Sequence, residues 1–139
     1  MIGPIIDILT EHSVIEVRER DSVLIAEWLT AQIPIGHVHF CNDVSTCLRV
    51  SSEVASRLVS EHGIVPDWLA DGSITIADGP RYAAVSKKEL SQILMARGYE
   101  LALHTKPELD RSGIFSDAPV YVSSRCFGLR EFIIDALDS

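Results

Sequence analysis

The spacing of apolar positions along the chain predicts an alternation of short helices and strands. Runs with apolar residues three or four positions apart indicate helices, and runs in which apolar and polar residues alternate indicate strands. The predicted helices cover residues 4–12, 22–32, 52–62, 87–97 and 128–138. The predicted strands cover residues 14–20, 36–41, 46–50, 73–77, 81–85, 99–104 and 120–123.

This order of elements predicts an N-terminal αβα segment followed by three ββα units around a mixed sheet. At 139 residues the chain is long enough for one domain with a hydrophobic core, and short for two. We therefore expect a single compact domain over residues 1–139. Its expected class is α+β, with α/β as the alternative.

A valine–serine pair ends the second strand of each predicted unit. A serine there can accept a hydrogen bond from the first backbone N–H groups of the next helix, and Ser86 with Glu89 has the spacing of a capping box. Gly63 and Gly98 are predicted to end the first two of these helices. Two interpretations stay open: an internal duplication, or chance matches within the alternation. The three pairs are Val50-Ser51, Val85-Ser86 and Val122-Ser123, at spacings of 35 and 37 residues.

Composition is that of an ordinary soluble protein, with 47% apolar and 23% charged residues. No apolar stretch approaches the roughly 18 residues of a membrane-spanning helix. The N-terminus has no basic region, so no secretory signal is expected. The three cysteines are an odd number, which favours a reducing cytoplasm over a disulfide framework.

The net charge of −8 argues against sequence-independent nucleic-acid binding, which depends on neutralising phosphates. Residues 1–70 hold ten acids and four arginines, so most of the excess lies in the first half. Such a surface suits a basic macromolecular partner, as in an inhibitor, antitoxin or immunity protein. The alternative is a solvated surface that only aids solubility. The acids considered for it are Asp7, Glu11, Glu16, Glu19 and Glu27.

The densest set of potential metal ligands is the segment GHVHFCNDVSTC. On the strand predicted here, His37, His39 and Cys41 share one face. Imidazoles and a thiolate suit zinc, but neighbours on a strand face lie roughly 6–7 Å apart, so at most two adjacent members can share an ion. Cys47 is the nearest further ligand. The alternative is two half-exposed histidines beside buried cysteines.

Basic residues follow two of the valine–serine pairs, where helix electrostatics favours acids. Cations, serine hydroxyls and backbone N–H groups at a helix start can converge on an anion such as a phosphate or carboxylate. The alternative is ordinary caps with solvated cations. The predicted anion-binding residues are Ser86, Lys87, Lys88, Ser123, Ser124 and Arg125.

No catalytic motif is present, and no cofactor is predicted. The sequence favours a small acidic cytosolic binding or regulatory protein with a macromolecular partner, and the long segment 105–119 is a candidate contact. The alternative is a small enzyme or ligand-binding domain that uses the helix starts or the His/Cys set. Homo-oligomerisation stays open.

Overall fold

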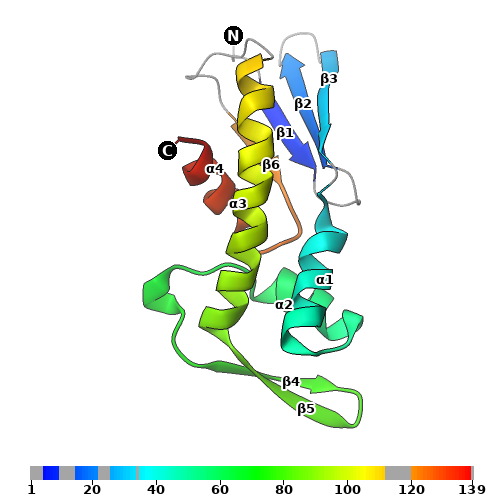
Figure 1. Cartoon of the computed structure of the whole chain (residues 1–139), viewed down its shortest axis with the longest axis vertical. Helices are drawn as coiled ribbons and strands as arrows, with labels where there is room; N and C mark the ends of the chain where they lie inside the picture. The colour runs from blue at the N-terminus through cyan, green and yellow to red at the C-terminus, as the bar shows by residue number, and fades with distance from the viewer. Residues whose placement is uncertain (1–4, 10–14, 22–25, 34, 112–119, 139) are drawn as a thin grey trace.

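The computed structural model describes the backbone of residues 5–9, 15–21, 26–33, 35–111 and 120–138, and the side chains of residues 35–107 and 124–137. Within these ranges the chain is α+β, with strands in two separate sheets (Figure 1). One sheet has four strands in the order β3-β2-β1-β6, and the other is the hairpin β4-β5. No described helix combines the length and apolar content needed to cross a membrane.

The four-stranded sheet is mixed. Its strands are β1 (Ile5–Leu9), β2 (Ile15–Asp21), β3 (Ala26–Ile33) and β6 (Val120–Ser123). β1 pairs antiparallel with β2 and parallel with β6, while β2 pairs antiparallel with β3. The strand predicted over 14–20 is confirmed as β2, but the helices predicted over 4–12 and 22–32 are wrong. The isoleucines of β1 suit a strand, and ladder pairing with β2 satisfies the backbone groups of β1 and β3.

Two helices follow, α1 (His37–Leu48) and α2 (Ser52–Glu61). The strands predicted over 36–41 and 46–50 are therefore wrong, because His37, Phe40 and Val44 are buried at helical spacing. The helix predicted over 52–62 is confirmed, and its N-cap Ser51 accepts a hydrogen bond from the Val54 N–H. Val50-Ser51 thus joins two helices rather than a strand and a helix.

The hairpin of β4 (Ser73–Asp78) and β5 (Arg81–Ser86) agrees with the prediction, with Gly79-Pro80 as its turn. It leads into α3 (Lys87–Arg111), whose first turn is capped by Ser86 as expected. This is the order of the second predicted unit. The repeat itself is not confirmed, because the first unit has no strands and the third lacks its first strand.

Helix α3 runs from the hairpin along the four-stranded sheet and contacts both β5 and β3 (Figure 1). The strand predicted over 99–104 is part of this helix, because Leu94, Leu101 and Thr105 continue one buried face. Gly98 does not end it. A Cβ at Gly98 would lie 2.8 Å from the Phe132 ring, so this glycine lets α4 (Leu129–Asp138) approach closely.

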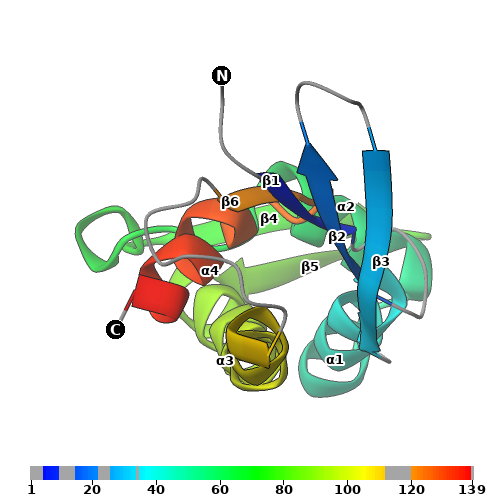
Figure 2. The ribbon, with the colours of Figure 1, turned by 90° about the horizontal axis from the view of Figure 1, so that it is seen from above.

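The last helix is close to the predicted range 128–138, and β6 matches residues 120–123. β6 nevertheless pairs with β1, not with a strand at 99–104. Figure 2 shows α3 and α4 on one side of the four-stranded sheet, where they contact β3 and β6. Of the segment 105–119, the first part is helix to Arg111, and residues 112–119 lie outside the described ranges.

The described core lies among the helices and the hairpin. Ile74, Ile76 and Val85 pack from the hairpin against it. An ion pair between Arg97 and Asp43 joins α3 to α1, with Nε–Oδ2 and Nη2–Oδ1 distances of 2.7 and 2.8 Å. The fully buried large side chains come from all four helices: Phe40, Val44, Leu58, Leu90, Leu94, Leu101, Leu129 and Ile133.

Two backbone segments cross in direct contact where α2 ends and α4 begins. We call residues 63–64 and 127–128 the Gly63–Gly128 crossing. The Ile64 N–H donates to the Phe127 carbonyl at 2.7 Å, and the Phe127 N–H donates to the Val59 carbonyl at 3.0 Å. Both glycines have positive φ, and a Cβ on either would lie 2.0 Å from a carbonyl oxygen of the opposite segment. Only glycine fits at these two positions.

Replacing Gly63 with alanine should therefore destabilise the protein far more than replacing Gly79. The two residues have φ of +55° and +61°, but nothing lies within 4 Å of a Cβ at Gly79. Gly79→Ala should cost only the left-handed strain, about 1–2 kcal/mol. Gly63→Ala adds a clash with backbone, so its loss of stability in urea unfolding should exceed that of Gly79→Ala by about 1–3 kcal/mol or more. Equal losses would mean that the crossing is not close-packed.

Candidate functional site

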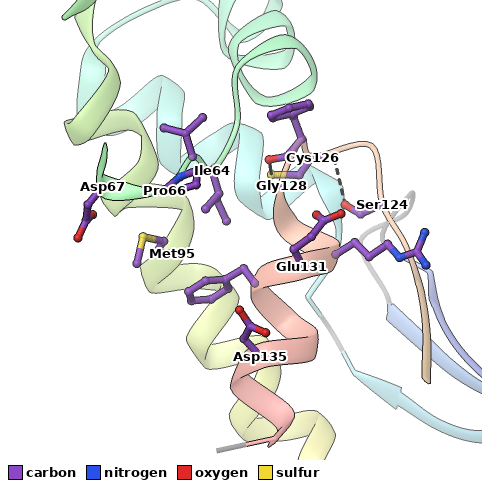
Figure 3. A pocket seen from close by; sticks show the side chains of 13 residues that line it. Ile64, Pro66, Asp67, Met95, Ser124, Cys126, Gly128, Glu131 and Asp135 are labelled. Carbon is purple, nitrogen blue, oxygen red and sulfur yellow. Dashed lines mark hydrogen bonds between the residues drawn. The ribbon is translucent and has the colours of Figure 1, made fainter. Parts of the chain in front are cut away.

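A pocket lies between α3, the start of α4 and the segment that follows the crossing. It has a volume of about 690 Å³, within the range of about 300–1,000 Å³ usual for ligand sites. We call it the α3–α4 pocket. Figure 3 shows Pro66 and Asp67 on one side and Ser124, Cys126 and Glu131 on the other, with Met95 and Asp135 nearby.

The pocket combines an apolar lining with mostly acidic charges. Three carboxylates and one guanidinium line it, from Asp67, Glu131, Asp135 and Arg130. Its local charge is therefore −2, which favours a cationic occupant over an anionic one. The apolar lining comes mainly from Ile64, Val65, Pro66, Met95, Phe127 and Phe132.

The pocket walls are held by hydrogen bonds that the sequence does not reveal. Ser91 is buried on α3, and its hydroxyl donates to the Val65 carbonyl and accepts from the Val65 N–H, both at 3.2 Å. On the other wall, the Ser124 hydroxyl accepts from the Cys126 N–H at 3.0 Å. The crossing joins these two walls through the bond from Ile64 to Phe127.

One exposed aromatic side chain lines this pocket, and two others are neighbours of lining residues. Phe127 lines it and is 56% exposed, and Trp68, next to Asp67 in the chain, is 77% exposed. Tyr99 is also exposed and packs edge-on against the pocket residue Phe132, with ring centroids 5.0 Å apart. Exposed apolar groups gathered at one place are typical of interaction sites.

Only the first three of the predicted anion-binding residues lie at the start of a helix. Ser86 caps α3, and the Lys87 N–H donates to the Gly72 carbonyl, so both groups are already used within the protein. Ser124 and Arg125 precede α4 by several residues rather than opening it. Lys87 lines a smaller pocket of about 230 Å³, whereas Ser124 lines the α3–α4 pocket.

Lys88 is exposed on α3, and Ser123 lies in β6, where its side chain is outside the described set. Anion binding at these six residues stays a prediction.

The predicted metal ligands lie on helix α1 rather than on a strand, and this changes which of them meet. His37 and Cys41 are one turn apart, with 3.3 Å between Nε2 and Sγ. His39 instead accepts a hydrogen bond from the Gly36 N–H, and Cys47 is exposed. No group of three or more His, Cys, Asp or Glu within the described ranges is placed to hold a metal ion. Metal binding stays a prediction that rests on no assembled site.

Several of these features escaped the sequence reasoning. The pocket residues Glu131 and Asp135 lie four positions apart on the final helix, and this spacing was a usable signal that the two carboxylates share one face. The pairing of His37 with Cys41 has the same spacing, but it was hidden by the strand assignment. The acids Asp7, Glu16, Glu19 and Glu27 have side chains outside the described set, as has Glu11, so their proposed acidic surface stays a prediction.

Models of known protein families give no match to this chain, and a search of curated proteins found no similar sequence.

The buried thiol of Cys126 should make the protein lose stability in alkali. Burial, together with the nearby charge of Cys41, raises the pKa of the Cys126 thiol from 9.0 to about 12. The unfolded chain therefore releases this proton first, and stability present below pH 9 is lost as pH rises toward the folded pKa. Between about pH 8 and about pH 11 the loss from this group is roughly 2–3 kcal/mol.

Cys126→Ala removes this titration while leaving every other group in place. Urea unfolding of both proteins across this range should show the wild type losing more stability than the variant by that amount. Parallel pH profiles of the two proteins would show that Cys126 ionises as easily in the folded state as in the unfolded one.

Proposed function

We propose that the protein binds a segment of a partner protein that presents an apolar side chain flanked by lysine or arginine. The observation that carries this proposal is the α3–α4 pocket, whose apolar lining lies among three carboxylates. The apolar lining offers burial of a partner side chain at about 25 cal/mol per Å². The carboxylates favour basic flanking residues and disfavour acidic ones.

The surroundings of the pocket support a macromolecular occupant. Trp68, Tyr99 and Phe127 are each more than half exposed around it, and aromatic side chains dominate the energetics of protein interfaces. The chain as a whole carries −8, which speeds the encounter with a basic partner. In this proposal the protein acts by binding its partner, as a regulator or inhibitor does, and catalyses no reaction in the pocket.

The hypothesis of an anionic ligand receives less support from these residues. The local charge of the α3–α4 pocket opposes an anion, and the hydroxyls of Ser86 and Ser124 already accept backbone N–H groups. The smaller pocket holds Lys87 but also Glu61, and its volume is below the usual range for a ligand site.

Charge reversal in the pocket should reverse the preference for peptide charge. The probes are three peptides with one shared apolar core, flanked by lysines, glutamates or serines. Wild-type protein should bind the lysine-flanked peptide best, with amide shifts in NMR spectra concentrated on residues 64–67 and 124–135. Glu131→Lys combined with Asp135→Lys should weaken that binding at least about tenfold, as expected for loss of two rim charges of about 0.7 kcal/mol each.

The matched control combines Asp71→Lys with Glu53→Lys, which change the net charge equally at exposed positions away from the pocket. It should retain most of the affinity for the lysine-flanked peptide. If both double variants bound this peptide equally weakly, the loss of affinity would come from the net charge of the protein and not from the pocket. Binding of all three peptides with equal affinity, or shifts away from the pocket, would contradict the proposal.

A further inference from the structure

Cys41 and His37 form a thiol–imidazole pair on α1. The distance of 3.3 Å between Cys41 Sγ and His37 Nε2 is within hydrogen-bond reach for sulfur. His37 is buried, whereas Cys41 is only partly buried, so a reagent can approach the thiol while the imidazole is held by packing. A nucleophile in direct contact with a base is the arrangement on which covalent catalysis and selective thiol modification depend.

Two further elements contribute groups to this pair. Ser56 of α2 and Arg125, from the turn before α4, both favour the ionised form of the Cys41 thiol. Burial raises the pKa of the Cys41 thiol, while Arg125 and Ser56 lower it. Because burial is the largest of these effects, the resting thiol is protonated, and its reaction needs a neighbouring base.

We propose that Cys41 is a reactive thiol that undergoes exchange with small anionic disulfides, with His37 as its base and Arg125 as the group that attracts the reagent. The observation behind this assignment is the contact between thiol and imidazole on one helix turn. The preference for an anionic reagent follows from Arg125, an exposed cation whose charge favours the Cys41 thiolate. The substrate class is a low-molecular-weight disulfide that carries carboxylates near its sulfur atoms.

The exchange balances without a further oxidant. The Cys41 proton passes to His37 Nε2, and the sulfur lone pair attacks one sulfur of the disulfide R–S–S–R. A new bond forms between Cys41 and that sulfur as the original S–S bond breaks. The leaving thiolate RS⁻ takes the proton from His37, so the products are a mixed disulfide on Cys41 and one free thiol.

The other two cysteines provide internal comparisons. Cys47 is exposed on the same helix, and within the described ranges no imidazole is hydrogen-bonded to its thiol as His37 is to Cys41. Cys126 is 3% exposed, and its thiol lies 3.8 Å from the Phe127 carbonyl. In native protein, Cys126 should therefore stay unmodified until the chain unfolds.

The test measures thiol exchange in a Cys47→Ser background with two probes, the dianionic dithiobis(nitrobenzoate) and the neutral dipyridyl disulfide. Mass spectrometry assigns the modified residue. His37→Gln should slow modification of Cys41 by about a hundredfold or more with both probes, the low end of what a positioned base contributes. Arg125→Gln, at an exposed position, should slow only the reaction with the anionic probe, by about threefold or more.

Arg81→Gln is the matched control, since Arg81 is also exposed but lies on β5 of the hairpin, and it should leave the preference between the probes unchanged. Circular dichroism and the melting temperature establish that each variant is folded. The proposal is overturned if Cys41 reacts only at the rate of global unfolding, if folded His37→Gln reacts as fast as its parent, or if Arg125→Gln slows both probes equally.

Discussion

The described part of the molecule depends on the Gly63–Gly128 crossing. There the segments at the end of α2 and before α4 come so close that neither glycine has room for a Cβ. Each Cβ would meet a carbonyl oxygen of the opposite segment. Ile64 and Phe127 share a short backbone hydrogen bond at this point. The contact fixes two glycines with positive φ and joins segments that are more than sixty positions apart in the sequence. Few other contacts in the described chain are as intolerant of an added atom.

The pocket follows from this constraint. Residues 64–67 leave the crossing on one side and are held to α3 by the two hydrogen bonds of Ser91 with Val65. Residues 124–128 leave it on the other side and lead into α4, whose Phe132 packs over Gly98 of α3. The apolar lining thus lies between two walls that are joined at the crossing, and the acids of α4 and Asp67 belong to the same lining. The same turn carries Arg125 toward Cys41, so both candidate sites share one support.

The sequence was informative where local signals agree with tertiary contacts. Ser51 and Ser86 cap helices, and the turn at Gly79-Pro80 joins two strands, because each works through neighbouring residues alone. It was misleading where distant contacts decide. The isoleucines of β1 have helical spacing but pair with β2 and β6, and Gly98 looks like a helix end but is a packing contact with Phe132. The pocket itself needs the crossing, which no local pattern encodes.

The most direct measurement of the crossing is amide hydrogen exchange in native protein, followed by NMR. The Ile64 and Phe127 amides both donate across it. If the crossing supports the structure, these two amides should exchange only through global unfolding, at the rate of the slowest core amides such as those of Leu94 and Leu101. Exchange at the rate of solvent-exposed amides that lack a hydrogen bond would show that the segments separate freely and would contradict the account.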